Sequence, residues 1–282
     1  MPEQYLPLDL REIPQQEIET ALYRALGLIA HNREYLEAHL RRAGADAETL
    51  QALADLSVAS ARLERTLGEL MALLECARGE AQPEMGEFDL CRALEDLFAV
   101  SRPLCEQMGV ALTLDCAGMD CCMVRGSLPY LEEIAVQLLS NALRACGPAG
   151  RVQLALRPGS GAVELLVRDN GCGLPDGTLP QKRRLNQHRR FLGGARGGLL
   201  LCREYCRQLG WGLELSSNLH GRGVEARVHI PLPLQEEAAS PQVLRLCSDD
   251  EIERENHRLL LRCRVRQELR MLPGEWMQQN QA

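Results

Sequence analysis

Apolar residues recur every three to four positions over two long stretches at the start of the chain, a spacing typical of amphipathic helices. In the first stretch, which follows Pro14, the apolar positions are Ile18, Leu22, Ala25, Ile29, Leu36 and Leu40. In the second stretch they are Leu53, Leu56, Leu63, Leu67, Leu70 and Leu74, in heptad phase. A turn at Gly44-Ala-Asp46 separates the two stretches. The pattern predicts a helical hairpin over residues 14–78.

The hairpin has one apolar stripe on each helix, and two helices cannot cover both stripes by themselves. The simplest arrangement that buries them is a four-helix bundle made from two chains. We therefore expect a homodimer through residues 14–78.

A linker over residues 79–87 leads into a segment in which helical and strand patterns are mixed. Helical spacing predicts helices at Asp89–Met108, Leu131–Arg144 and Leu199–Leu209. Alternating apolar runs predict strands at Val110–Cys116, Arg151–Arg157, Val163–Asp169, Gly212–Ser217 and Gly223–Leu232. Helices on one face of a mixed, mostly antiparallel sheet make an α/β sandwich, so residues 88–233 are expected to form a domain of the α+β class.

The tail, residues 234–282, begins with a polar stretch that contains Ser240-Pro241. A helix is predicted from Asp249 to Met271, and Pro273 stops it. The sequence alone gives this helix no role.

Composition narrows the class of protein. The 282 residues carry a net charge of -7, which argues against general nucleic-acid binding. No apolar run is long enough to span a membrane, and the start Met1-Pro-Glu-Gln-Tyr-Leu-Pro lacks the basic and apolar regions of a signal peptide. A cytoplasmic protein is expected. The 12 cysteines show no paired C-x-x-C spacing, so neither a disulfide framework nor a zinc site is indicated.

The candidate chemistry lies between Leu131 and Leu201. The helix there places Gln137, Asn141 and Arg144 on one face. The next apolar strand runs into Asp169-Asn-Gly171-Cys-Gly173, a carboxylate followed by glycines that allow close backbone approach to a ligand. A stretch from Lys182 to Arg196 is rich in arginine and free of acids. Glycines at 193–198 then precede a helix start, a candidate phosphate site.

In order and spacing these pieces resemble the ATP-binding domain of sensor histidine kinases, within the superfamily that also holds gyrase, the Hsp90 chaperones and the mismatch-repair ATPases. The N box of that family matches Gln137-Leu-Leu-Ser-Asn141-Ala, and the first glycine box matches Asp169-Asn-Gly171-Cys-Gly173-Leu-Pro175. A degraded second glycine box lies at Gly194 to Leu199. The hairpin resembles the dimerisation and phosphoacceptor hairpin of the same family.

The resemblance implies ATP and Mg²⁺ as ligands and gives each matching residue a role. Asp169 would accept a hydrogen bond from the adenine amino group, with Gly171 and Gly173 leaving room beside the ring. Asn141 would offer its side-chain oxygen to Mg²⁺, and Arg144 would meet a phosphate. In the second glycine box the corresponding residues are Gly194, Arg196 and Gly198, and the cationic stretch from Lys182 would form a lid over the triphosphate.

Several positions depart from the family pattern. Gln16 occupies the place of the phosphoacceptor histidine, and His31, about four helical turns further on, is the remaining candidate besides His39. Arg196 replaces the middle glycine of the second glycine box. Gln137 stands where the hydrolytic members carry a glutamate that activates water, which disfavours simple ATP hydrolysis.

Three hypotheses follow for function. The first is a histidine-kinase-like signalling protein that binds Mg-ATP, with phosphotransfer weak or lost. The second is a non-catalytic, ATP-binding regulatory module, or pseudokinase. The third is a serine or threonine kinase like the anti-sigma-factor branch, although that branch lacks the long hairpin. A response regulator or another signalling protein is the expected partner, besides a second copy of the chain.

Overall fold

The computed structural model describes residues 15–147, 149–173, 196–217, 222–232 and 251–269. The chain divides into two compact units, Met1–Met71 and Ala72–Ala282. The division falls inside the second long helix, so the first unit contains the whole first hairpin helix, the turn and most of the second hairpin helix.

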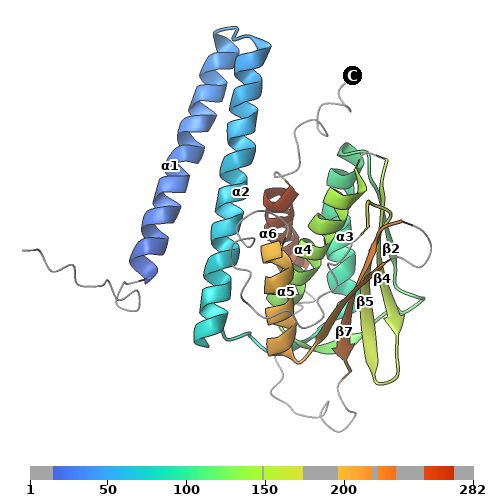
Figure 1. Cartoon of the computed structure of the whole chain (residues 1–282). Helices are drawn as coiled ribbons and strands as arrows, with labels where there is room; N and C mark the ends of the chain where they lie inside the picture. The colour runs from blue at the N-terminus through green and yellow to red at the C-terminus, as the bar shows by residue number, and fades with distance from the viewer. Residues whose placement is uncertain (1–14, 148, 174–195, 218–221, 233–250, 270–282) are drawn as a thin grey trace, which may run out of the picture. The chain divides into compact units, whose positions relative to one another are not determined.

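The first unit is a helical hairpin (Figure 1). Helix α1 covers Gln15–Arg42 and helix α2 covers Ala47–Arg78. Gly44 takes a φ of 71° in the turn between them. Asp46 then stabilises the start of α2, because its Oδ1 accepts a hydrogen bond of 2.7 Å from the backbone N–H of Thr49.

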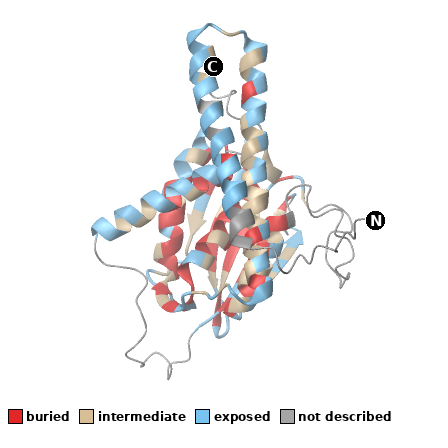
Figure 2. Cartoon of the chain, turned by 90° about the vertical axis from the view of Figure 1, so that its left-hand side faces the viewer, coloured by how far each residue is buried: buried red, intermediate tan, exposed pale blue. Residues whose placement is uncertain are grey.

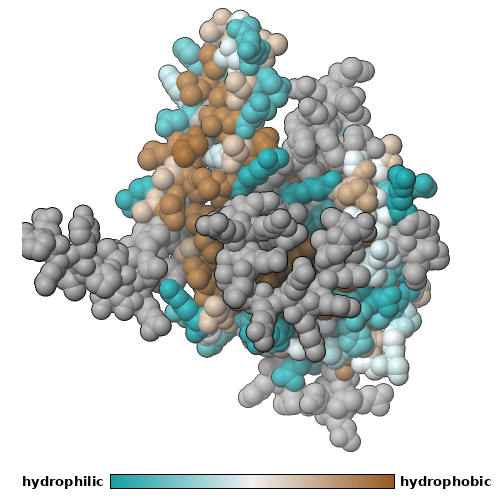
Figure 3. Space-filling model, in the orientation of Figure 1, coloured by the Kyte–Doolittle hydropathy of each residue, from teal (hydrophilic) through white to brown (hydrophobic). Residues whose placement is uncertain are grey.

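Most of the apolar surface of the hairpin is exposed within a single chain. Among its described residues, Leu26, Leu53, Met71 and Cys76 are the buried apolar side chains. Several large apolar side chains on both helices stay exposed, namely Leu22, Leu28, Ile29, Leu36, Leu56, Leu63 and Leu70. In the space-filling view the hairpin carries a band of hydrophobic surface along its length (Figure 3).

The second unit is built on a five-stranded mixed sheet with the order β2-β4-β5-β7-β6. Its strands are β2 (Ala111–Asp115), β4 (Arg151–Pro158), β5 (Ala162–Asp169), β6 (Gly212–Ser217) and β7 (Val224–Pro231). Strands β2 and β4 are parallel, and the other neighbouring pairs are antiparallel. Two short strands, β1 (Gly86–Asp89) and β3 (Met123–Gly126), pair with each other in a separate antiparallel sheet.

Three helices cover one face of the large sheet (Figure 1). They are α3 (Leu90–Gln107), α4 (Leu128–Cys146) and α5 (Arg196–Leu209). Alternate residues of β5, such as Val163, Leu165 and Val167, are buried in the core with the apolar sides of these helices. Figure 2 shows many of the buried residues in the helices and strands of this unit.

The opposite face of the sheet carries charged side chains that pair with one another. Glu225 on β7 pairs with Arg168 of β5 and with Arg227 of its own strand. Arg227 also pairs with Glu164 of β5. Cross-strand pairs of opposite charge stabilise a sheet whose face meets water.

The tail contributes a further helix, α6 (Glu251–Leu269), which packs against α3 and α4. Leu261, Val265 and Leu269 follow one another at intervals of four and are all buried. The sequence predicted a helix here from Asp249 to Met271, but it did not predict that this helix is part of the second unit.

The observed architecture confirms the predicted α+β class, with a helical hairpin followed by an α/β sandwich on a mixed sheet. The predicted division into residues 14–78, 79–87, 88–233 and 234–282 stays an expectation. Among the helices that the structure describes, none is long and apolar enough to cross a membrane.

Candidate functional site

A cavity of about 290 Å³ is lined by residues of α4, the start of α5 and the strands β5, β6 and β7. Most of its lining is apolar and comes from Leu138, Ala142, Ala145, Val167, Leu199, Leu215, Val224 and Ala226. Asn141, Arg144 and Asp169 add polar groups, and Gly173 completes the wall. An apolar pocket with a few convergent polar groups is the usual form of a small-molecule site.

Asp169 supplies the buried carboxylate of this cavity. It ends β5 on the same side of the strand as Val167, and only 5% of its surface is exposed. Its Oδ1 accepts hydrogen bonds from the backbone N–H groups of Gly171, at 2.8 Å, and Val224, at 3.2 Å. Burial raises the pKa of Asp169 above its ordinary value, and these two N–H groups oppose the rise. The carboxylate is therefore fixed in orientation at one end of an apolar pocket.

Glycines let the backbone close around Asp169. A Cβ on Gly171 would lie 2.3 Å from the carbonyl oxygen of Ala145, so this glycine allows the turn after β5 to touch the end of α4. Gly173 has a φ of 82°. Gly223 has a φ of 116°, and a Cβ there would lie 2.0 Å from the carbonyl oxygen of Asp169. The turn after β5 and the start of β7 thus meet at this carboxylate.

Asn141 places an amide in the cavity wall. Its Oδ1 and Nδ2 are buried and have no hydrogen-bond partner among the described residues. Buried polar groups in native proteins are normally satisfied, so an orphaned amide in a cavity calls for a ligand or water. A side-chain oxygen of this kind fits the oxygen-rich coordination that Mg²⁺ prefers.

Arg144 lies one turn after Asn141 on α4 and also lines the cavity. Its Nη2 donates to Oε1 of Glu268, on α6, at 3.2 Å. The side chain of Arg144 is 23% exposed, whereas that of Glu268 is 9% exposed. A cation that was predicted to meet phosphate is thus paired with a carboxylate from the tail.

The structure brings four of the predicted site residues together around one cavity: Asn141, Arg144, Asp169 and Gly173. Gly171 does not line the cavity. It lies in the turn after β5, and a side chain there would collide with Ala145 of α4. Gly198 is buried in the first turn of α5, next to the cavity residue Leu199.

The remaining predicted residues lie elsewhere. Gly194, the side chain of Arg196 and the predicted lid from Lys182 onward fall outside the described residues, although the backbone of Arg196 begins α5. His31 is an exposed residue of α1, in the first unit. Gln137 is buried on α4 and donates from Nε2 to Glu133 at 2.9 Å.

Sequence reasoning missed several residues of the site. The apolar wall from β6 and β7, including Leu215 and Ala226, looks in sequence like any other core strand. Gly223 was assigned to the end of a turn and the start of a strand but not to the site, although a glycine there is a signal for close backbone approach. Glu268 gave no signal, since its partner Arg144 is 124 positions away.

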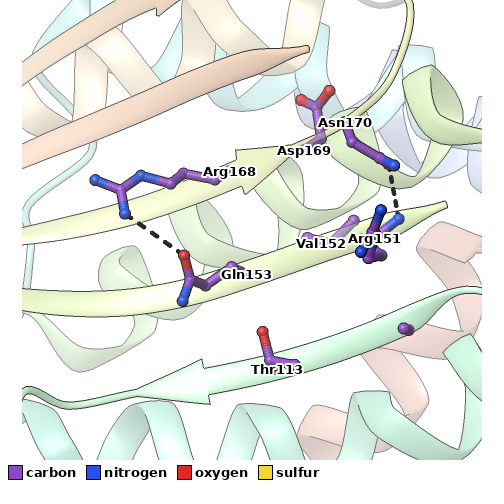
Figure 4. A pocket seen from close by; sticks show the side chains of 8 residues that line it. Thr113, Arg151, Val152, Gln153, Arg168, Asp169 and Asn170 are labelled. Atoms are coloured by element: carbon purple, nitrogen blue, oxygen red, sulfur yellow. Dashed lines mark hydrogen bonds between the residues drawn. The ribbon is translucent and has the colours of Figure 1, made fainter. Parts of the chain in front are cut away.

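A second hollow, of about 300 Å³, lies on the charged face of the sheet and is lined by residues of β2, β4 and β5 (Figure 4). Arg168 reaches Gln153 across the strands at 3.5 Å, and the backbone N–H of Arg151 donates to Asn170 at 2.7 Å. Of the predicted site residues only Asp169 lines it. Polar groups that line this hollow form hydrogen bonds with one another within the sheet. The first cavity is therefore the better candidate for a ligand site.

The sandwich fold, the N-box helix and the apolar cavity that ends in a carboxylate have the arrangement expected of a histidine-kinase-like ATPase domain. The family model described as "Histidine kinase-, DNA gyrase B-, and HSP90-like ATPase" matches residues 126–234. The second unit therefore contains a histidine-kinase-like ATPase domain, as its motifs indicated.

Curated relatives share longer stretches of the chain. The autoinducer 2 sensor kinase/phosphatase LuxQ of Vibrio cholerae is 24% identical over 213 residues, which cover 73% of this chain and 25% of LuxQ. The sensor protein DivL of Caulobacter vibrioides is 29% identical over 197 residues, which cover 68% of this chain and 24% of DivL. The chain thus spans about a quarter of the length of these relatives.

Solved histidine kinases share the fold. The kinase ThkA, solved in complex with the response regulator TrrA, gives a TM-score of 0.53 at 16% identity, covering 77% of this chain and 61% of ThkA. Full-length ShkA, solved with AMPPNP, gives 0.52 at 19% identity, covering 74% of this chain and 45% of ShkA. The Acinetobacter baumannii kinase AdeS gives 0.50 at 16% identity, covering 75% of this chain and 98% of that structure.

Proposed function

We propose that the second unit binds Mg-ATP in the cavity around Asp169. The observation that carries the proposal is the fixed, buried carboxylate at the end of an apolar pocket. Apolar walls from Leu138, Leu215 and Val224 suit the faces of a purine ring, and the carboxylate of Asp169 suits its exocyclic amino group. The nucleotide carried by ShkA, a protein of similar fold, supports this assignment.

Asn141 and Arg144 then face the phosphate end of the nucleotide. Asn141 would hold Mg²⁺ through Oδ1, consistent with a buried amide that has no partner in the described parts of the chain. When bound, Mg²⁺ would neutralise phosphate charge. Arg144 offers a guanidinium suited to phosphate oxygens. We assign Gly194, Arg196 and Gly198 to the same end on the strength of the motif alone.

The hairpin is proposed to form a homodimer. Its exposed leucines on α1 and α2 repeat along both helices and leave an apolar surface that a single chain does not cover. A second copy of the same hairpin would bury both stripes in a four-helix bundle. The complex of ThkA with TrrA makes a response regulator a reasonable further partner for a chain of this fold.

Phosphotransfer is proposed to be weak or absent, so that the chain acts as an ATP-dependent regulatory module. Gln16 has no imidazole to accept a phosphoryl group. His31 lies 15 residues beyond Gln16, which is about 22 Å along a helix axis. In-line positioning of nucleophile and phosphoryl group can supply about 7–11 kcal/mol of the barrier lowering, so a displaced histidine forfeits most of it.

Incubation with γ-labelled ATP tests these alternatives, followed by acid and alkali treatment of any labelled protein. We expect no label on the wild-type chain. An acid-labile label that disappears in His31→Ala would show that the chain is a working histidine kinase. An acid-stable label would favour the serine or threonine kinase. If Gln16→His gains an acid-labile label, the chain is a kinase that has lost its phosphoacceptor, which supports the regulatory-module hypothesis.

A further inference from the structure

The C-terminal helix α6 is held to the ATPase domain by two buried acids. Asp96 of α3 is 4% exposed and accepts from Nη2 of Arg254 at 2.8 Å and from Nε of Arg258 at 2.7 Å. Glu132 of α4 is 7% exposed and pairs with His257 and Arg264. A buried carboxylate is tolerated only when cations and donors compensate it, so α6 supplies the cations that α3 and α4 require.

Apolar contacts fix the register of the same helix. Leu261, Val265 and Leu269 lie on one side of α6 and are buried in the core cluster of the second unit. Glu268 belongs to the last turn described, between Val265 and Leu269. The position of its carboxylate is therefore set by the packing of the whole helix.

That carboxylate reaches the nucleotide cavity. Glu268 is buried, and its Oε1 accepts from Nη2 of Arg144 at 3.2 Å. Arg144 stands in the cavity wall with Asn141 and Asp169. An arginine side chain stays protonated, so its guanidinium can pair with a carboxylate or with a phosphate. A phosphate that approaches Arg144 would also meet the negative charge of Glu268.

We propose that Glu268 competes with the phosphates of the nucleotide for Arg144, so that docking of α6 and nucleotide binding oppose each other. The proposal rests on nucleotide binding at Asp169, the function proposed above. By thermodynamic linkage, whatever affinity α6 removes from the nucleotide, the nucleotide removes from the docking of α6. The tail helix then senses whether the site is filled.

Calorimetric titration of the full chain with Mg-ADP tests the competition. Glu268→Gln keeps the size of the side chain and removes its charge. It should tighten Mg-ADP binding by roughly two- to fivefold, because Arg144 no longer faces a competing carboxylate. The matched control is Glu255→Gln, which alters an exposed acid of the same helix and should leave affinity unchanged.

A second measurement follows α6 directly. Amide hydrogen exchange over residues 257–269 should speed up when wild-type protein is saturated with Mg-ADP, and this response should shrink in Glu268→Gln. Unchanged or weaker Mg-ADP binding by Glu268→Gln, or slower exchange of α6 with the nucleotide, would overturn the competition. Asp169→Asn separates the two proposals: if wild-type protein binds and Asp169→Asn binds poorly, the site stands even when the competition fails. Wild-type protein that does not bind Mg-ADP would refute both.

Discussion

Replacing Asp169 by asparagine is the sharpest test of the nucleotide site, because it changes charge without changing shape. The amide oxygen of the new side chain could still accept from the N–H groups of Gly171 and Val224, which now bond to Oδ1. The other oxygen would be replaced by an NH₂ donor, which cannot accept a hydrogen bond from an adenine amino group. The fold is therefore preserved while the base contact is lost.

The expected loss follows from the hydrogen bond removed. A hydrogen bond to a charged group contributes about 1.5–3 kcal/mol, and about 1.4 kcal/mol corresponds to a factor of ten in affinity. Asp169→Asn should therefore weaken Mg-ATP binding by roughly 10- to 150-fold. Charged interactions at exposed sites contribute little because water screens them. Asp169 is only 5% exposed, so we expect the larger loss of affinity.

Calorimetry with Mg-ATP measures the affinity, and thermal melting checks that the variant is folded. Asp115→Asn is a matched control, since it makes the same chemical change on β2, where Asp115 pairs with Arg157. Burial raises the pKa of Asp169. As the pH is lowered, its carboxylate should therefore be protonated, and wild-type affinity for Mg-ATP should fall, at a higher pH than for an ordinary aspartate. Equal affinity of wild type and a folded Asp169→Asn would refute the placement of adenine.

The remaining predictions concern stability and assembly. A positive φ costs a residue other than glycine about 1–2 kcal/mol. Gly223→Ala should lower the free energy of unfolding by more than this, because its Cβ would overlap the carbonyl group of Asp169. Gly161→Ala is the control: Gly161 has a φ of 71° with open space around it, so denaturant titration should show only the smaller cost. The close contact with the Glu132 carboxylate raises the pKa of His257 above the ordinary 6.5. The stability from this pair is thus full below about pH 6.5 and is lost as pH rises through the raised pKa, so melting temperatures of wild type and His257→Ala should converge in alkali; a gap that widens with pH would contradict this. A fragment from Gly86 to the C-terminus should fold and be monomeric in light scattering, whereas the full chain should be a dimer at micromolar concentration, and a monomeric full chain would count against the bundle.

The sequence predicted elements well where one face of each element is buried. β5 was expected at Val163–Asp169 and runs from Ala162 to Asp169, because alternation of buried and charged residues defines a strand closely. The tail helix was expected at Asp249–Met271 and is described from Glu251 to Leu269. Both predictions depend on local periodicity, which a single sequence contains.

The residues of the candidate site could be predicted only where they belong to a short sequence motif. Asp169 and Asn141 were found because a short motif fixes their type and spacing. The apolar wall from Leu215 and Val224 was not found, since a side chain that lines a cavity has the same hydrophobicity as one in the core. The pair between Arg144 and Glu268 depends on how α6 docks, and no local pattern encodes a contact between residues so far apart.

The buried acids that pair with α6 also affect where this domain can be truncated without loss of stability. The family model ends at residue 234, and a protein trimmed there would keep α3 and α4 but lose the helix that packs against them. Asp96 and Glu132 would then face water without the cations of α6, beside apolar surface that Leu261 and Val265 had covered. Such a product should aggregate and be short-lived in solution. We therefore expect the stable form of the ATPase domain in this protein to extend to the end of α6.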